Sequence, residues 1–324
     1  MKKKIIIGVV AALIVAAIVV ASVLPGGSNT NDDGVFHVGV CQLDVHPALD
    51  AATEGFIAAL KAELGEDKVK IDLQNAAGEA TNCTNIVNAF VSKNYDLIMA
   101  NATPALQAAT AATATIPVLG TSVTEYGVAL GIDNFTGVTG MNVSGTSDLA
   151  PLDKQAQMIL DLVPGVQTVG IIYCSGEPNS QYQVNVVKEY LEGKNITVKL
   201  YSFADSNDLP AITQTAVTEV NAIYIPTDNT VARSTGIIDN ICRPAKMPVI
   251  CGEENSAKGC GIVALSISYY DLGYTTGQMA AKILRGEAKA SEMAIQYATP
   301  VYKYNEEICR ELNITVPENY EAIQ

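Results

Sequence analysis

This 324-residue sequence has no tryptophan and only two histidines, His37 and His46. Histidine is the usual general base and a frequent metal ligand. The H-E-x-x-H, G-x-S-x-G and Walker-type patterns of metalloproteases, hydrolases and nucleotide-binding proteins are also absent. No G-x-G-x-x-G follows the first expected strand, so dinucleotide binding is not indicated. We therefore expect no enzymatic activity, no catalytic residue, no metal site and no cofactor.

Basic residues are scarce as well. The chain has 20 Lys and Arg against 34 Asp and Glu, which gives a net charge of −14. Nucleic acids and anionic membrane surfaces attract proteins with clustered Lys and Arg, so neither is an expected partner of the folded body. A cleft can differ in charge from the whole protein, and the global field therefore does not fix the charge of a bound ligand.

The seven cysteines are spread along the chain, and none forms a C-x-x-C pair. This excludes the spacing of a zinc ribbon or a thioredoxin-like site. Cys251 and Cys260 are the simplest pair if an exported protein oxidises two of its thiols. Buried free thiols are an equal alternative, and the sequence predicts no particular disulfide.

The one long apolar run lies at the N-terminus. Three lysines after Met1 precede the apolar stretch Ile5–Leu24, so we interpret residues 1–24 as a signal or anchor segment. We favour an uncleaved membrane anchor over a signal cleaved after Ser22. Either alternative places the body outside the cytoplasm, with membrane contact only through this segment. Residues 25–34 are rich in Gly, Asn and Asp, which predicts a flexible linker.

The body contains an internal repeat. The stretch Ala222–Asn229 is an apolar strand that ends in Pro-Thr-Asp-Asn, and Asp96–Pro104 resembles it earlier in the chain. Each is followed by a helical pattern and then by a strand led by proline, at Pro117 and Pro248. Strands alternating with helices predict parallel sheets with right-handed crossovers. We therefore expect an α/β protein of two Rossmann-like, doubly wound parallel-sheet lobes joined by a multi-strand hinge.

The order of the segments suggests how the chain divides between the lobes. We assign residues 35–148 to lobe 1, with residues 262–290 returning to it, and residues 149–261 to lobe 2, with residues 291–324 returning to it. Several crossings between two rigid halves favour a hinge motion.

The expected ligand site is a cleft between the lobes, because ligands bind at the carboxyl ends of open parallel sheets. Asp228 could pair with an ammonium group, with Glu253 as a second candidate. The helix starts at Thr103 and Ser180 could donate backbone N–H groups to a carboxylate. Capping of helices is the alternative role for Asp228 and Ser180. The full set of candidate ligand-binding residues is Gln42, His46, Thr103, Pro104, Ser122, Asn179, Ser180, Asp228, Asn229 and Glu253.

Several segments together resemble one known family, the substrate-binding components of ABC transporters of the tryptophan/tyrosine-binding type. The resemblance covers nearly the whole body from Val35 onward. Its segments are Gln42-x-x-x-His46-Pro47-Ala-Leu-Asp50, Ala102-Thr-Pro-Ala105, Asn134-Phe-Thr-Gly137, Asn179-Ser180, Ala222–Asn229, Tyr269-Tyr-Asp-Leu-Gly273-Tyr-x-x-Gly277 and the tail Asn305–Pro317.

This resemblance implies a type I periplasmic-binding-protein fold that closes on a small ligand and delivers it to an ABC permease with its ATPase. Aromatic amino acids are among the family's ligands. The family usually has Asp-Pro where this chain has Glu125-Tyr126, so we expect a changed cleft wall. We predict an extracytoplasmic solute-binding component of an ABC importer that binds a small ligand, an amino acid, in the cleft. The alternative is a ligand-sensing surface receptor domain of the same fold.

Overall fold

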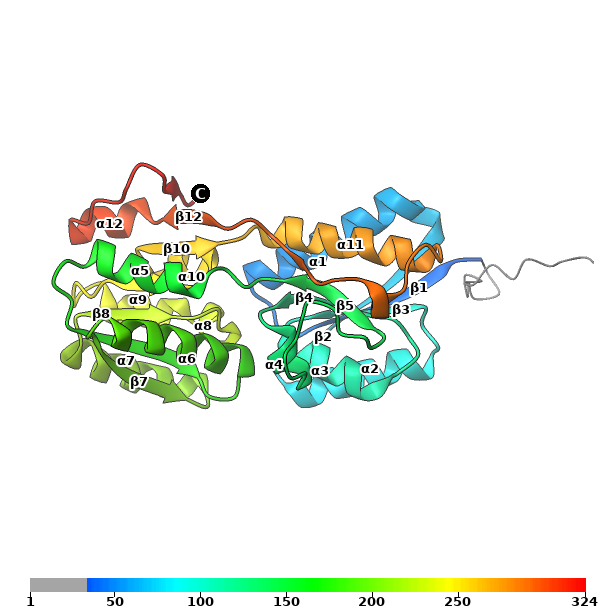
Figure 1. Cartoon of the computed structure of the whole chain (residues 1–324), viewed down its shortest axis with the longest axis horizontal. Coiled ribbons are helices and arrows are strands. Elements are labelled where there is room, and N and C mark those ends of the chain that lie inside the picture. Colours follow the sequence, from blue (N-terminus) through cyan, green and yellow to red (C-terminus); the bar gives the residue numbers. More distant parts are fainter. Residues whose placement is uncertain (1–33) are drawn as a thin grey trace, which may run out of the picture.

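The computed structural model describes residues 34–324, which form two α/β lobes lying side by side (Figure 1). Each lobe is built on one sheet with helices on both faces. The expected signal or anchor segment lies outside the described residues, and so does the linker apart from Gly34. Within residues 34–324 no helix is both long and apolar enough to cross a membrane.

Lobe 1 has a six-stranded sheet in which every strand pairs parallel to its neighbours. Its strands, in sheet order, are β11 (Gln296–Tyr297), β5 (Val143–Ser147), β4 (Val118–Val123), β3 (Leu97–Asn101), β1 (Phe36–Gln42) and β2 (Val69–Asn75). Its helices are α1 (Pro47–Leu64), α2 (Ala80–Ser92), α3 (Thr103–Ala112) and α4 (Tyr126–Leu130). Gly65 ends α1 with a φ of 95°, as its position after the apolar pattern predicts.

Lobe 2 has a seven-stranded sheet that is parallel except where β10 meets β12. Its strands, in sheet order, are β13 (Glu321–Ala322), β12 (Val301–Tyr304), β10 (Val263–Ser266), β9 (Val249–Cys251), β8 (Ala222–Ile225), β6 (Thr168–Cys174) and β7 (Thr197–Phe203). Its helices are α5 (Leu152–Leu162), α6 (Pro178–Gly193), α7 (Leu209–Glu219), α8 (Asn229–Ala232), α9 (Thr235–Cys242), α10 (Glu254–Cys260) and α12 (Glu306–Leu312).

The repeat found in the sequence corresponds to a repeated strand order in the two sheets. Strands β2-β1-β3-β4-β5 of lobe 1 and β7-β6-β8-β9-β10 of lobe 2 follow the same spatial order. This order reverses between β1 and β3 and again between β6 and β8, and such a reversal opens a crevice at the carboxyl ends of the strands. The predicted fold class of two doubly wound parallel-sheet lobes is confirmed.

The second and third crossings between the lobes differ from those expected. β10 is fully buried between β9 and β12, so residues 262–266 belong to the sheet of lobe 2 and do not return to lobe 1. The chain crosses after β10, and α11 (Tyr269–Leu284) then packs on lobe 1. β11 pairs with β5, whereas β12 pairs with β10. Residues 291–324, which we expected to return to lobe 2 as a unit, are therefore divided, with β11 in the sheet of lobe 1 and β12 in that of lobe 2.

Helix α11 is held on lobe 1 by close packing against α1. A β-carbon at Gly55 would lie 2.1 Å from the Tyr270 carbonyl oxygen, and one at Gly273 would lie 1.8 Å from that of Ala52. Only glycine allows the two helix backbones to approach this closely. The approach fixes Tyr269, the first residue of α11, at the junction of the lobes. Gly273 thus has a packing role in the Tyr269–Gly277 segment.

The cysteines agree with the alternative of buried free thiols. All seven are buried and free in the structure. They lie in or beside the strands and helices of both lobes, where a thiol packs as a small apolar side chain.

Candidate functional site

A cavity lies between the lobes, where the carboxyl ends of the two sheets face each other. Measured for the centre of a water-sized sphere, its volume is about 10 Å³, so the lobes leave only a narrow space between them. Both lobes and the segments that cross between them contribute to its wall. The lining residues are His46, Ala48, Leu49, Ser122, Thr124, Asp148, Asn179, Thr227, Asp228, Asn229, Ala232, Glu253 and Tyr269.

Six of the ten residues singled out from the sequence line this cavity: His46, Ser122, Asn179, Asp228, Asn229 and Glu253. Gln42, Thr103, Pro104 and Ser180 do not. The Gln42 side chain is occupied within lobe 1, where it donates to the Asp44 carbonyl and Asp50 and accepts from Thr53. Thr103 is buried at the first turn of α3, which Pro104 shares. The expectation that the helix starts at Thr103 and Ser180 bind a carboxylate does not fit this arrangement.

Asp228 lies on the cavity wall, yet both of its carboxylate oxygens have protein partners. Oδ2 accepts from the Cys174 backbone N–H (2.7 Å) and from Ser180 Oγ (2.8 Å), and Oδ1 accepts from the Val231 N–H (2.9 Å). Asp228 is thus the N-cap of α8, the alternative role considered for it. Burial and the nearby Glu177 carboxylate raise the pKa of Asp228 to about 7.

The neighbouring acidic residues of lobe 2 are satisfied in the same way. Glu253 caps α10 by accepting from the backbone N–H groups of Asn255 and Ser256. Glu177 precedes the first turn of α6, which begins at Pro178 and not at Ser180 as expected. Its carboxylate accepts from Asn229 and Thr230, through their backbone N–H groups and their side chains. The carboxylates of Asp228, Glu253 and Glu177 are therefore all satisfied within lobe 2.

Asp148 is a cavity residue that the sequence analysis missed. It follows β5 in the segment that crosses to α5, and its side chain is 5% exposed. Its Oδ2 accepts from the Tyr269 hydroxyl at 3.0 Å, whereas its Oδ1 has no partner. Burial raises the pKa of Asp148 to about 6, and the nearby Thr124 and Tyr269 hydroxyls lower it in part. An acidic residue directly after β5, a strand of the parallel sheet, was the signal that could have found it.

Unpartnered polar atoms gather at this cavity. Within residues 34–324, six buried side-chain N or O atoms have no hydrogen-bond partner. Four of them belong to cavity residues: His46 Nδ1, Ser122 Oγ, Asp148 Oδ1 and Asn179 Oδ1. Buried polar groups are rarely left unpaired, because each costs about 1–3 kcal/mol. Their concentration in one place marks this cavity as the candidate binding site.

Ser122 carries a second sign of a functional position. Its φ is 53°, in the left-handed region, and it lies at a bulge of β4 opposite β5. This conformation is costly for a residue with a β-carbon and is often retained where it presents a group to a ligand. The bulge places the Ser122 hydroxyl in the cavity wall, while the fully buried Thr121 beside it does not line the cavity.

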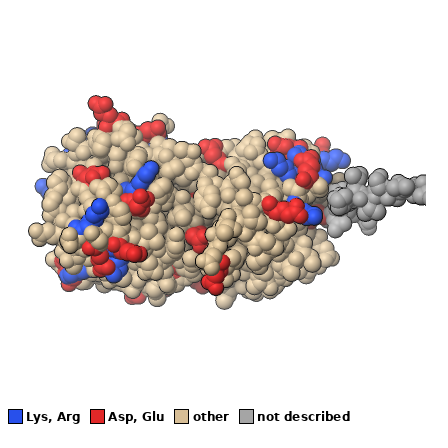
Figure 2. All heavy atoms as spheres, viewed as in Figure 1, with Lys and Arg blue, Asp and Glu red and all other residues tan. Residues whose placement is uncertain are grey.

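The cavity is acidic. Asp148, Asp228 and Glu253 line it, and no lysine or arginine does. On the face shown in Figure 2, Lys and Arg lie toward the two ends of the molecule, and the middle, where the lobes meet, has Asp and Glu but no basic side chain. Among the described residues, no group of three or more His, Cys, Asp or Glu side chains could hold a metal ion. A positive charge on an organic ligand would therefore complement this wall.

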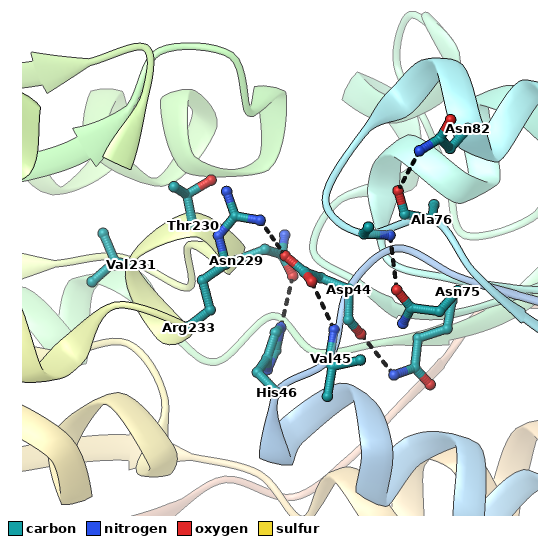
Figure 3. A network of polar contacts seen from close by, with 12 residues as sticks. Asp44, Val45, His46, Asn75, Ala76, Asn82, Asn229, Thr230, Val231 and Arg233 are labelled. Atoms are coloured by element: carbon teal, nitrogen blue, oxygen red, sulfur yellow. Dashed lines mark hydrogen bonds and ion pairs between the residues drawn. The ribbon is translucent and has the colours of Figure 1, made fainter. Parts of the chain in front are cut away.

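Two polar contacts join the lobes beside the cavity (Figure 3). Arg233, after α8 of lobe 2, forms an ion pair with Asp44, after β1 of lobe 1. His46 Nε2 lies 3.3 Å from Asn229 Oδ1. These contacts hold the two lobes together at the edge of the cavity. A ligand can enter or leave the cavity once the lobes separate.

Glu125 and Tyr126, which stand where the family usually has Asp-Pro, do not line the cavity. The changed cavity wall that we expected from this difference is therefore not found. Glu125 caps α4 by accepting from the Val128 N–H, and the Tyr126 hydroxyl donates to the Thr146 carbonyl at 3.0 Å. Neither side chain lines the cavity. Tyr269 lines the cavity, whereas its neighbour Tyr270 does not.

Comparisons with known proteins agree with this architecture. The sequence profile of the family described as ABC transporter substrate binding protein matches residues 37–323. A tyrosine-binding protein of Clostridioides difficile is 34% identical over 295 residues, which are 88% of this chain and 85% of that protein. An ABC domain from Streptococcus pneumonia in complex with L-Trp is 31% identical, with a TM-score of 0.83 over 88% of this chain and 96% of that one.

A third relative bears on the arrangement of the lobes. The ligand-free, open structure of a substrate-binding protein from Clostridium difficile is 36% identical and covers 90% of this chain and 99% of its own, but its TM-score is 0.69. The L-Trp complex superposes better at lower sequence identity. The two lobes here are therefore placed more like those of the complex than those of the open form.

Proposed function

The chain belongs to the family of ABC transporter substrate-binding proteins, and we propose that it is the extracytoplasmic solute-binding component of an ABC importer. It has the type I periplasmic-binding-protein fold that the resemblance implied. In this proposal it binds an amino acid in the cavity between its lobes and delivers it to a membrane permease without changing it chemically.

The observation that carries the proposal is the set of unpartnered atoms around the cavity. His46, Ser122 and Asp148 come from lobe 1 and its first crossing, and Asn179 comes from lobe 2. A ligand that bonds all four joins the two lobes. Binding then favours the closed arrangement, because only that arrangement offers all the contacts at once. We propose these four residues as direct ligand contacts, with Asp228, Asn229 and Glu253 holding the wall behind them.

Two named relatives support the class of ligand. One is called a tyrosine-binding protein and another was solved with L-Trp. Tyrosine and tryptophan are small zwitterions with an aromatic side chain, and the acidic and hydrogen-bond-accepting groups of the cavity suit the ammonium end of such a ligand. We propose that an aromatic amino acid is the ligand, with Tyr269 available to pack against it.

The test is ligand-induced thermal stabilisation of the purified full-length chain. Each of the twenty L-amino acids is added in turn, with glucose as a control, because a ligand of the native state raises Tm by mass action. We expect L-tyrosine or L-tryptophan to give the largest rise. Uptake of that amino acid should fall in cells that lack the gene. If no amino acid raises Tm, the proposed ligand class is wrong.

A further inference from the structure

We propose that the cavity recognises a primary ammonium group through three hydrogen-bond acceptors, Asp148 Oδ1, Asn179 Oδ1 and His46 Nδ1, and that Asp148 rather than Asp228 supplies the counter-charge. This inference rests on the proposed function and specifies which part of the ligand the protein recognises. It follows from the identity of the unpartnered atoms.

The hydrogen-bond network makes Nδ1 of His46 an acceptor when the imidazole is neutral. Asn229 Nδ2 donates to Glu177 Oε2 at 2.7 Å, which fixes the orientation of the Asn229 amide and leaves its Oδ1 as an acceptor. His46 Nε2 faces that oxygen at 3.3 Å and must therefore carry the proton. In the neutral imidazole, Nδ1 then has a free lone pair.

The Asn179 amide is oriented by a similar argument. Its Nδ2 donates to the Thr227 carbonyl at 3.1 Å and to Glu177 Oε2 at 3.2 Å, and both partners can only accept. Its Oδ1 is therefore the acceptor left without a donor. Asp148 Oδ1 is an acceptor whenever the carboxylate is ionised. Three hydrogen-bond acceptors of the cavity wall thus have no donor within the protein.

An ammonium group has the three N–H donors that these acceptors lack, and it carries the positive charge that Asp148, Asp228 and Glu253 leave unbalanced. A carboxylate would instead meet three acceptors and three negative side chains. Of the four unpartnered atoms, only Ser122 Oγ can donate to it. The ammonium is therefore the group on which affinity depends most.

Asp228 is less available than Asp148 to pair with the ammonium group. Its two oxygens already accept three hydrogen bonds from Cys174, Ser180 and Val231. Asp148 accepts one from Tyr269 through Oδ2 and keeps Oδ1 free. Since Asp148 lies on the segment that crosses between the lobes, an ammonium bound to it lies beside the hinge.

The experiment compares three probes by isothermal titration at pH 7.5: L-tyrosine, tyramine, which lacks the carboxylate, and 3-(4-hydroxyphenyl)propanoate, which lacks the ammonium. We expect the propanoate to bind at least about 100-fold more weakly than L-tyrosine and also more weakly than tyramine. If tyrosine does not raise Tm, the same trio is made from whichever L-amino acid does.

The variant Asp148→Asn then identifies the partner of the ammonium. It should weaken binding of tyrosine and tyramine about 30-fold or more and leave the propanoate unchanged, because the propanoate lacks the group that Asp148 contacts. The control Asp153→Asn removes an exposed carboxylate from α5 nearby and should change none of the three affinities. Retained ligand-free stability shows that the variant is folded.

The outcomes separate the two proposals. If an L-amino acid binds but its analogue without the ammonium binds equally well, or better than the analogue without the carboxylate, the inference is overturned while the proposed function stands. Unchanged tyrosine affinity in folded Asp148→Asn overturns the assignment to Asp148. If no amino acid binds, the proposed function fails and the inference fails with it.

Discussion

The two lobes share one strand order but differ in how their polar groups at the cavity are used. In lobe 2, Asp228, Glu253 and Glu177 each accept backbone N–H groups at the start of a helix. In lobe 1 and its first crossing, His46, Ser122 and Asp148 each keep a buried polar atom without a partner. Lobe 2 contributes one such atom to the cavity, on Asn179.

This difference indicates a division of roles between two halves of similar architecture. The acidic wall of lobe 2 stabilises the fold, since its oxygens satisfy helix starts that would otherwise be unpaired. The wall from lobe 1 keeps buried polar atoms without partners, which we propose a ligand completes. Substitutions in lobe 2 should therefore act mainly on stability, and those in lobe 1 mainly on binding. Four experiments, given in order of decreasing expected effect, test this difference between the lobes.

The largest effect is expected for Asp228→Ala in lobe 2. It leaves the Cys174 N–H, the Ser180 hydroxyl and the Val231 N–H without their acceptor, so the free energy of unfolding should fall by about 3 kcal/mol. Urea denaturation measures the loss. The exposed Asp208→Ala in the same lobe is the control and should change stability by less than about 0.5 kcal/mol. A free energy of unfolding equal to that of the wild type would show that Asp228 has no structural role.

The second effect is on pH dependence and comes from Asp148. Its pKa is raised to about 6 in the folded protein from an ordinary value of 3.8, so the folded state binds this proton more tightly than the unfolded state. The ionised carboxylate therefore destabilises the empty protein. The favourable contribution of its proton is present below about pH 4 and is lost as pH rises through about 6.

Comparing the wild type with Asp148→Asn isolates this contribution. Without ligand at pH 7.5, the variant should be more stable by about 1–3 kcal/mol, and the difference should diminish toward pH 4. Ligand affinity should show the opposite trend. In the wild type it should fall about tenfold for each pH unit below 6 as Asp148 takes up a proton. Denaturation and titration calorimetry across pH 4–8 measure both, and a pH-independent difference would contradict the prediction.

The third effect separates strain from hydrogen bonding at Ser122. Ser122→Gly removes the β-carbon at a φ of 53° and should raise the free energy of unfolding by about 0.5–1 kcal/mol. Ser122→Ala keeps the strained backbone and should not give this gain. Both variants lose the hydroxyl, and both should weaken ligand binding by about 5–10-fold. Equal stability of the two variants would argue against strain at this position.

The smallest effect is expected for Arg233→Ala, which removes the ion pair between the lobes. The Arg233 side chain is 33% exposed, so solvent screens the pair and the loss of stability should stay below about 1 kcal/mol. The lobes should separate more easily, and the radius of gyration of the ligand-free protein measured by X-ray scattering should increase. An unchanged scattering profile would show that the pair does not hold the lobes closed.

Much of the fold could be predicted because it depends on local patterns. The apolar strands that end at Asn101 and Ile225, and the helices that follow them, repeat in order along the chain. Such periodicities survive in the structure because burying the apolar faces is the dominant favourable term in folding. Residues 262–266 were misassigned because an apolar strand fits either sheet equally well by pattern. Only its pairing with β9 and β12 decides between the lobes.

The site could be predicted only in part. The rule for parallel sheets led to Asp228 and Asn179, which do line the cavity. It could not show that Ser180 already donates to Asp228, or that Gln42 is occupied by Asp44, Asp50 and Thr53. Asp148 was missed because the segment around it has no clear periodicity, although it too follows a strand of a parallel sheet.

By itself, the sequence determined the two-lobed parallel architecture, the family resemblance and several of the strand ends that line the cavity between the lobes. These properties depend on the order and spacing of residue types, which are local and repeated. Only the tertiary structure decided which polar atoms remain free, because a side chain's remaining hydrogen-bonding capacity depends on partners that are distant in sequence. Asp228 and Asp148 are the same residue type at the ends of parallel strands, and their different partners alone give them different roles.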